Sequence, residues 1–389
     1  MIEEDLDYGA LFILPSDAMG GAEKVLRLVA LHCGRSAHKG QVWIYVLSGK
    51  QPTLSPFAAQ GVNVKVVYSG KRRAFQGVPG LIRFTLSKQF NIVMSSHTHV
   101  NALTSLLRRL RLLKTRLLVA RESTMIFERD FSLPKKIALR AMYRLYGAHD
   151  RIVCQTEEMR ASLNHHTGYK YAEETETIGN PICLHEIDEA RSQIAEGFQS
   201  TGNPLIVWCG RFHPVKRPEI AVDTLAILRD DCQFDPHLLM IGKGPLLTEV
   251  QNKVLRLRLG NMCTFAGYQE NPVALFAART GSIGLLTSET EGFPNVILEM
   301  LAAGMDRVVV TPCCAGLVDV PGVTVASSFE PNDIAAAIRH ALTTPANRAS
   351  INAHLAARNI NEYARLVLKP TKIAGSFVKK QPRHIGQDQ

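Results

Sequence analysis

The chain has 389 residues, 46% of them hydrophobic and 21% charged; this is the composition of a folded protein, and the length predicts two domains of roughly 180 residues. The net charge is +10, but no zinc-finger, homeodomain or RNP-type motif accompanies it, so nucleic acid is not an expected partner. No apolar run reaches the ~20 residues of a membrane-spanning helix, the start MIEEDLDYG lacks the order of a signal peptide, and the eight cysteines form no C-x-x-C pair, which together predict a cytoplasmic protein with reduced thiols.

The first half of the chain alternates strand-like and helix-like segments. Apolar runs typical of buried strands occupy residues 9–14, 42–47, 62–68, 91–95, 116–120 and 151–155. Helical patterns separate most of these runs, for example at residues 22–33 and 134–146. Gly20 and Gly21 follow the first strand and open the first helix, so a phosphate or a sugar can approach the positively polarised helix N-terminus there. An ordinary glycine-rich turn is the alternative.

The cations of the first half are concentrated in three segments, residues 71–73, 108–116 and 135–144. In the last two, Arg and Lys are interleaved with Leu, Ile, Ala, Met and Tyr at helical spacing. This pattern favours an anionic membrane surface as a partner, which would place the protein on the inner face of the membrane. An ordinary solvated helix face is the alternative.

The second half alternates more regularly. A Gly-Asn-Pro turn at residues 179–181 marks the expected domain boundary. Strands are predicted beyond it at residues 205–209, 237–241, 262–265, 282–286 and 307–310. Helices are predicted between them at residues 218–229, 246–259 and 271–278, and a further one is opened by Pro294.

Repeated strand–helix units with apolar strands predict parallel sheets that helices cover on both faces. The fold class is therefore α/β, with two doubly wound, Rossmann-like domains facing each other across a cleft. We expect residues 1–180 to form the first domain and residues 181–360 the second. Residues 361–389 are expected to form a C-terminal helix and tail that return to the first domain.

The segment 281–304 carries the strongest functional signal. It combines a buried strand, a polar loop with Glu291, and a helix with Glu299. Loops at the carboxyl ends of parallel strands are where open α/β sheets bind ligands. A helix N-terminus, free backbone N–H groups and two carboxylates suit a phosphorylated sugar. The two carboxylates resemble the acid and nucleophile of a glycosidase, but the helical position of Glu299 disfavours that interpretation.

Two cations and two glycines belong to the same predicted edge. Arg211 and Lys216 follow the strand at residues 205–209, where their charges can neutralise a diphosphate leaving group in place of a metal; a surface ion pair is the alternative for a lone strand-end Arg. Gly242 and Gly244 follow the next strand, where a base or ribose can approach the backbone. No metal site is predicted, because the His97-Thr98-His99 run has no third ligand at metal spacing.

Four motifs in this order resemble the retaining glycosyltransferases of family 4, which have the two-domain fold called GT-B. They are Gly210-Arg211 with Lys216, IGKGP at residues 241–245, FAGY at residues 265–268, and EGFPNVILE at residues 291–299, which matches the family's E-x7-E signature. The resemblance is weaker around Gly20-Gly21 and Asn180-Pro181.

The resemblance implies an enzyme that transfers a hexosyl group from a nucleotide-sugar, a UDP- or GDP-sugar, with retention and without a metal or other cofactor. Arg211 and Lys216 would hold the diphosphate, Glu299 the ribose hydroxyls, and Glu291 the donor sugar. The remaining donor-binding residues would be Gly242, Gly244, Tyr268, Phe293, Pro294 and Asn295. The acceptor, a glycan or a lipid-linked glycan of cell-surface polysaccharide synthesis, would bind the first domain at Gly20 and Gly21.

The chain departs from the family pattern in two places. Many members carry a histidine near the strand at residues 116–120, where this chain has Arg121 and Glu122; either of these or His97 is expected to take that role. After the E-x7-E helix the family's Gly-x-Pro-Val is replaced by GMDRV at residues 304–308. Two other interpretations remain open: a GT-B epimerase or glycosyl phosphorylase, and a non-catalytic GT-B scaffold at the membrane.

Overall fold

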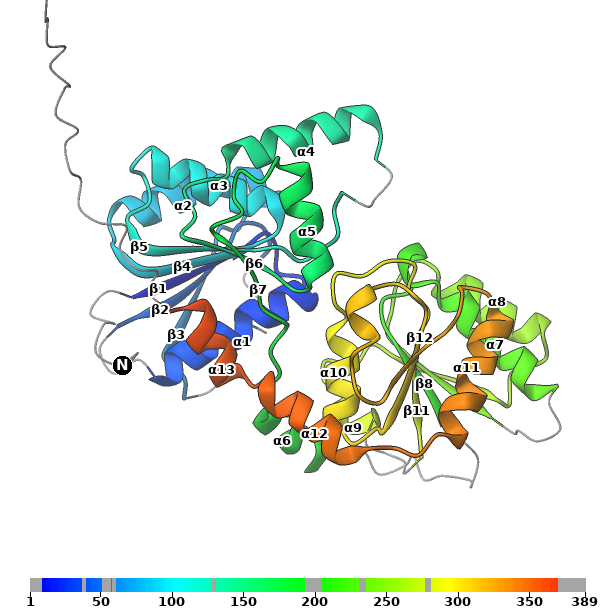
Figure 1. Ribbon diagram of the computed structural model, residues 1–389. Helices are drawn as coiled ribbons and strands as arrows, with labels where there is room; N and C mark the ends of the chain where they lie inside the picture. The colour runs from blue at the N-terminus through cyan, green and yellow to red at the C-terminus, as the bar shows by residue number, and fades with distance from the viewer. Residues whose placement is uncertain are drawn as a thin grey trace, which may run out of the picture.

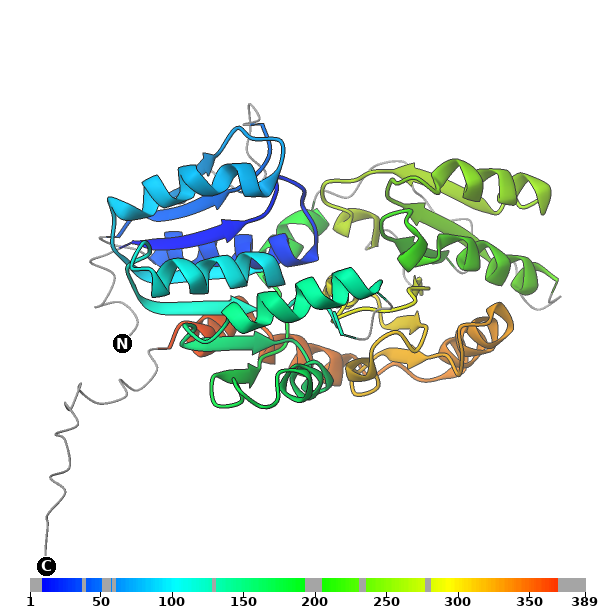
Figure 2. The same cartoon turned by 90° about the horizontal axis from the view of Figure 1, so that it is seen from above.

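The computed structural model describes residues 9–36, 40–50, 57, 61–127, 131–192, 205–230, 236–276 and 281–369. These residues form two domains side by side, each built on a parallel sheet (Figures 1 and 2). The α/β fold class predicted from the sequence is confirmed. The tail expected after residue 369 lies outside the described residues.

The first domain contains a seven-stranded sheet in the order β3-β2-β1-β4-β5-β6-β7. Its strands are β1 (Ala10–Leu14), β2 (Val42–Val46), β3 (Val64–Tyr68), β4 (Phe90–Ser96), β5 (Thr115–Arg121), β6 (Arg151–Cys154) and β7 (Thr175–Thr177). Its helices are α1 (Gly21–Ser36), α2 (Ala74–Leu86), α3 (Thr98–Arg109), α4 (Leu133–Leu145) and α5 (Glu157–His166). Side chains of β1 alternate between two cores: Phe12 packs with α1, and Leu11 packs with residues of α2 and α3.

The second domain contains a six-stranded sheet in the order β10-β9-β8-β11-β12-β13. Its strands are β8 (Leu205–Cys209), β9 (His237–Ile241), β10 (Cys263–Gly267), β11 (Ile283–Leu286), β12 (Arg307–Val310) and β13 (Val323–Val325). Its helical elements are α6 (Leu184–Ser192), η1 (Pro214–Lys216), α7 (Pro218–Arg229), α8 (Leu247–Arg256), α9 (Val273–Phe276), α10 (Asn295–Ala302), η2 (Ala315–Leu317), α11 (Pro331–Thr343) and α12 (Arg348–Ala357). One core holds α7, α8 and α11, and the other holds α6, α9, α10 and α12.

In each sheet the strand order reverses at one point, between β1 and β4 in the first and between β8 and β11 in the second. Ligands of open α/β sheets bind at such switch points, at the carboxyl ends of the strands. The loops that leave the four strands there contain Gly20-Gly21, His97, Gly210 to Lys216, and Glu291. The topology therefore places Gly20, Gly21 and His97 at one switch point, and Arg211, Lys216 and Glu291 at the other; residues 241–245 and 265–268 lie at the carboxyl ends of the neighbouring strands β9 and β10.

The chain crosses between the domains twice, and the two crossings are hydrogen-bonded to each other. The amide of Ile182 donates to the carbonyl of Arg358 at 2.8 Å, and the amide of Ile360 donates back to the carbonyl of Ile182 at 3.1 Å. After the second crossing, α13 (Ile360–Val367) packs against α1 and adds Tyr363 and Val367 to the core of the first domain. Figure 1 shows α12 and α13 spanning the join.

Candidate functional site

Lys216 and Glu291 meet at the switch point of the second sheet. Lys216 ends the short helix η1, whose last carbonyl accepts a hydrogen bond from Thr287 Oγ1 at 2.9 Å. Trp208 Nε1 donates to the same hydroxyl at 2.9 Å, so the turn is fixed to both β8 and β11. Lys216 Nζ forms an ion pair with Glu291 Oε1, and both side chains are less than one-fifth exposed. The shared edge predicted from the sequence thus brings these two residues into contact.

Arg211 lies apart from this pair. Its side chain is exposed, and it forms no ion pair with any residue in the described part of the chain. It is a cation at the edge of the site that is available to an anionic ligand.

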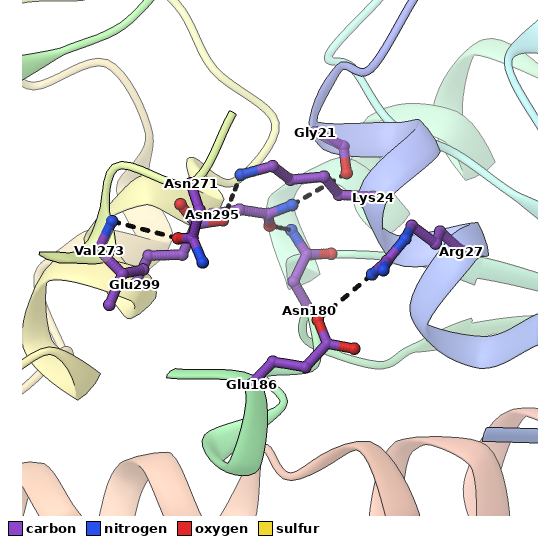
Figure 3. A network of polar contacts seen from close by, with 9 residues as sticks. All are labelled: Gly21, Lys24, Arg27, Asn180, Glu186, Asn271, Val273, Asn295 and Glu299. Carbon is purple, nitrogen blue, oxygen red and sulfur yellow. Dashed lines mark hydrogen bonds and ion pairs between the residues drawn. The ribbon is translucent and has the colours of Figure 1, made fainter. Parts of the chain in front are cut away.

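Glu299 lies on α10 and pairs across the domain boundary with Lys24 of α1, with 2.9 Å between Nζ and Oε1 (Figure 3). Burial acts to lower the pKa of Lys24, but the charge and hydrogen bond of Glu299 outweigh it and the pKa lies above its usual value. Burial, together with the charge of Glu299, raises the pKa of the Cys209 thiol at the end of β8 to about 12.

Asn295 also bridges the domains, from the first turn of α10. Its Nδ2 donates to the carbonyl of Gly21 at 2.9 Å, and its Oδ1 accepts from Asn180 Nδ2 at 2.5 Å. Asn180 also donates to the carbonyl of Phe293 at 3.3 Å. The start of α10 is therefore held against the first domain (Figure 3).

The other predicted donor-binding residues include two side chains that shape the loop before α10 and one exposed aromatic ring. Phe293 is buried in the core, and Pro294 is the N-cap of α10, so their side chains shape the loop. Tyr268 is 53% exposed, with Lys243 Nζ 4.1 Å from its ring centroid.

Gly242 and Gly244 allow the two neighbouring strand-end loops to pack closely. Both have positive φ, at 141° and 158°. A Cβ at Gly242 would collide with the carbonyl oxygen of Gly210, and one at Gly244 with that of Phe212. The glycines are thus required by the backbone packing at this edge.

Three residues predicted in the first domain gather at its switch point. His97 has a φ of 79° and places Nε2 3.4 Å from Glu23 Oε1. Glu23 also closes the space beside Gly20, where a Cβ would lie 2.6 Å from its Oε2. Gly21 begins α1 and faces Asn295 of the second domain.

Arg121 and Glu122 lie inside the first domain, away from its surface. Glu122 is 3% exposed and accepts hydrogen bonds from Tyr146 Oη at 2.6 Å, Tyr143 Oη at 3.0 Å and Asn101 Nδ2 at 3.1 Å. Arg121 is 1% exposed and donates to Asn180 Oδ1 at 2.6 Å. Both side chains face internal partners, so His97 is the one of the three candidates that lies at the switch point.

Sequence reasoning missed Lys24, Glu23 and the bridging role of Asn180. Lys24 lies one helical turn after Gly21, so the helical pattern alone places the two on one face. This shared helix face is the sequence signal that could have identified Lys24 as a site residue. The partner of Lys24, 275 positions further along the chain, has no local signature.

The two basic segments differ in their contacts. Arg108 pairs with Asp150, and Arg109 donates to the carbonyl of Tyr146, so the cations at the end of α3 hold the domain together. On α4, Leu133 and Ile137 are 69% and 58% exposed, and all four cations of the helix are exposed. Figure 1 shows α4 along the edge of the first domain.

No helix among the described residues is both long and apolar enough to cross a membrane. Within the same residues, no three His, Cys, Asp or Glu side chains gather closely enough to hold a metal ion.

Two family models match the chain, one in each domain. Residues 19–186 match the family described as Glycosyltransferase Family 4, and residues 203–344 match Glycosyl transferases group 1. Each of the two domains therefore matches a glycosyltransferase family model. The Anabaena protein HepE in complex with UDP-glucose has a TM-score of 0.72 and 17% identity to this chain, over 92% of this chain and 98% of HepE. This likeness concerns the fold, and it confirms the predicted GT-B architecture.

Two curated relatives are similar over shorter stretches. N-acetyl-α-D-glucosaminyl L-malate synthase of Bacillus anthracis is 30% identical over 106 residues, and D-inositol 3-phosphate glycosyltransferase of Jonesia denitrificans is 32% identical over 154 residues. The matches cover 27% and 38% of this chain, and 27% and 33% of the relatives' lengths.

Proposed function

We propose that the protein is a retaining glycosyltransferase that moves a hexosyl group from a UDP- or GDP-sugar to a glycan or lipid-linked acceptor in cell-surface polysaccharide synthesis. The observation that carries the proposal is the ion pair of Lys216 with Glu291, in the loop that leads into α10. Glu299 lies on that helix, one turn after its first residue. The likeness to a glucosaminyl malate synthase and to an inositol phosphate glycosyltransferase supports it, as does the UDP-glucose complex of HepE.

Lys216 and Arg211 are assigned to the diphosphate. Both are cations at the carboxyl edge of β8, and the first turn of α10 adds a positively polarised helix end. Fixed positive groups that face the departing diphosphate stabilise the charge that develops as its bond to the sugar breaks. In this role they replace a metal ion, and the protein needs no cofactor.

Glu291 and Glu299 take different parts of the donor. Glu291 lies in the loop with Lys216 and is assigned to the sugar, while Glu299 is assigned to the ribose hydroxyls. In a front-face reaction the bond from the anomeric carbon to the phosphate oxygen breaks, and the acceptor oxygen bonds to that carbon on the same face. The acceptor's proton passes to the leaving phosphate. His97 and Glu23, at the opposite switch point, are assigned to the acceptor.

A thermal-shift panel of UDP-, GDP-, ADP- and dTDP-sugars tests the donor class, because a ligand that binds the folded state raises its stability. Substitution of Glu291 then distinguishes its role from that of Glu299. Glu291→Gln should lower turnover and leave the binding of the free nucleoside diphosphate unchanged. Stabilisation by none of these nucleotides would refute the proposal. Release of sugar phosphate on addition of inorganic phosphate would favour a phosphorylase instead.

An anionic membrane surface is proposed as the partner of α4. The helix exposes Leu133 and Ile137 among four cations, which combines apolar contact with charge attraction. Binding to anionic vesicles should fall with added salt. Since each cation near such a surface contributes on the order of 1 kcal/mol, Lys136→Gln with Arg140→Gln should weaken vesicle binding by about 30-fold.

A matched pair in the second domain controls for the lost charge. Arg256 and Arg258 are also exposed, and Arg256→Gln with Arg258→Gln removes the same two charges far from α4. This control should bind vesicles as the wild type does. Equal loss in both pairs, or no sedimentation of the wild type at low salt, would contradict the membrane assignment.

A further inference from the structure

The strongest feature not explained by the proposed reaction is the contact between α1 and α10. Two residues of α1, Gly21 and Lys24, lie on one face of that helix, and Asn295 and Glu299 lie on one face of α10. The two faces meet, so each helix supplies one partner to each of two polar contacts, both of 2.9 Å (Figure 3).

Glu299 is the buried member of the ion pair. Its side chain is 15% exposed, against 36% for Lys24, and Lys24 is its one hydrogen-bond partner among the described residues. Without the ammonium, the carboxylate would be a partly buried negative charge with few hydrogen-bond donors around it. Such a site favours a ligand that supplies hydrogen-bond donors.

Lys24 and a bound ribose would compete for Glu299. A ribose presents two neighbouring hydroxyls, which a carboxylate can bind through its two oxygens. Lys24 Nζ already donates to Oε1, so one lone pair of that oxygen is used and the ammonium limits the approach of a hydroxyl to it. Release of the ammonium makes the whole carboxylate accessible to the ribose.

We propose that Lys24 is an interdomain latch: it holds the domains together while no donor is bound, and it competes with the nucleotide's ribose for Glu299. The inference rests on the proposed donor role of Glu299. Binding of the nucleotide releases Lys24, and loss of the product nucleotide allows the ion pair to form again. The latch therefore weakens nucleotide binding and assists product release.

A second ion pair from the same helix provides the control. Arg27, one turn further along α1, pairs at 3.2 Å with Glu186 of α6, which packs in the core of the second domain. Like the latch, this pair crosses the domain boundary and is partly exposed. Unlike the latch, it does not involve Glu299.

Calorimetric titration with UDP, and separately with GDP, tests the competition. Lys24→Met should bind the diphosphate about two- to fivefold more tightly, the range expected for loss of a partly exposed ion pair. Arg27→Met should bind as the wild type does. In a Glu299→Gln background, Lys24→Met should produce no gain.

The outcomes separate the latch from the donor assignment. Unchanged or weaker binding by Lys24→Met, or an equal gain in Arg27→Met, would overturn the latch alone, provided that Glu299→Gln weakens binding. If Glu299→Gln binds with unchanged affinity, the donor assignment fails, and the latch fails with it.

Small-angle scattering tests closure independently of the nucleotide. Lys24→Glu places two carboxylates in contact and should enlarge the radius of gyration of the free protein. Adding Glu299→Lys restores an ion pair of reversed polarity and should restore the compact form, although the ribose carboxylate is gone. A swap that stays expanded would show that the pair does not hold the domains together.

Discussion

Replacing Glu122 distinguishes a buried structural role from the ligand-binding role that the sequence suggested. The carboxylate is 3% exposed and accepts from four buried donors, at 2.6, 3.0, 3.1 and 3.4 Å. Glu122→Leu removes this shared acceptor and leaves the two tyrosine hydroxyls with contacts to Thr98 at 3.4 Å. Each donor that loses its partner costs about 1–3 kcal/mol. The substitution also relieves the burial of a charge, which offsets part of that loss. We expect a net fall of about 3–5 kcal/mol in the free energy of unfolding, because a buried hydrogen-bond network is broken.

The two tryptophans allow each domain to be followed by itself. Trp43 lies on β2 of the first sheet and Trp208 on β8 of the second. In a Trp208→Phe background, urea unfolding followed by fluorescence reports the first domain; in Trp43→Phe it reports the second. With a slope of about 2 kcal/mol per molar urea, Glu122→Leu should lower the first midpoint by about 2 M. The second midpoint should stay in place.

Glu173→Leu is the matched control, since it removes an exposed carboxylate of the same domain. Its effect should stay within about 0.5 kcal/mol. A shift below about 1 kcal/mol for Glu122→Leu, together with a raised KM for the acceptor, would refute the buried network and return Glu122 to the ligand-facing role.

Three further predictions concern pH, the domain bridge and metal ions. Burial lowers the pKa of His149 to about 3, so between that pH and about 6.5 this histidine binds a proton only in the unfolded chain. Stability should fall as pH drops through this window, by up to about 1.4 kcal/mol per pH unit from His149, and His149→Gln should reduce the slope by that amount. The losses of unfolding free energy caused by Asn180→Ala and Asn295→Ala should be non-additive by about 1 kcal/mol in the double mutant, as measured by thermal unfolding. Additive losses would show that the two side chains do not interact. Transfer should continue in excess EDTA because Lys216 and Arg211 face the diphosphate; activity lost there and restored by manganese would contradict this.

The sheets could be predicted from the sequence because buried parallel strands are continuous apolar runs. The strands that escaped prediction, β7 and β13, are three-residue edge strands of mixed polarity, TET and VTV. The contact of Lys216 with Glu291 followed from one rule, that the carboxyl ends of parallel strands share an edge.

Arg121 and Glu122, which are candidates from the family resemblance, also end a strand, yet their side chains are buried. Whether a strand-end side chain faces the cleft or the interior depends on what packs beside it. Here Tyr143 and Tyr146, at the end of α4, supply hydroxyl donors to Glu122. Asn180, at the domain crossing, receives Arg121. These partners come from distant parts of the chain, so no local pattern indicates them.

The geometry divides the proposed donor site between parts that do and do not depend on domain closure. Lys216 and Glu291 both belong to the second domain, and Thr287 fixes their turn to its own sheet. Rotation of one domain against the other leaves that pair intact. Glu299 is different, because its partner, Lys24, moves with the first domain. Contacts to the diphosphate and sugar are therefore set by one domain, and access to the ribose carboxylate is set by the distance between two. A nucleotide can therefore bind first through its phosphates. Its ribose competes with Lys24 for Glu299 in a later step.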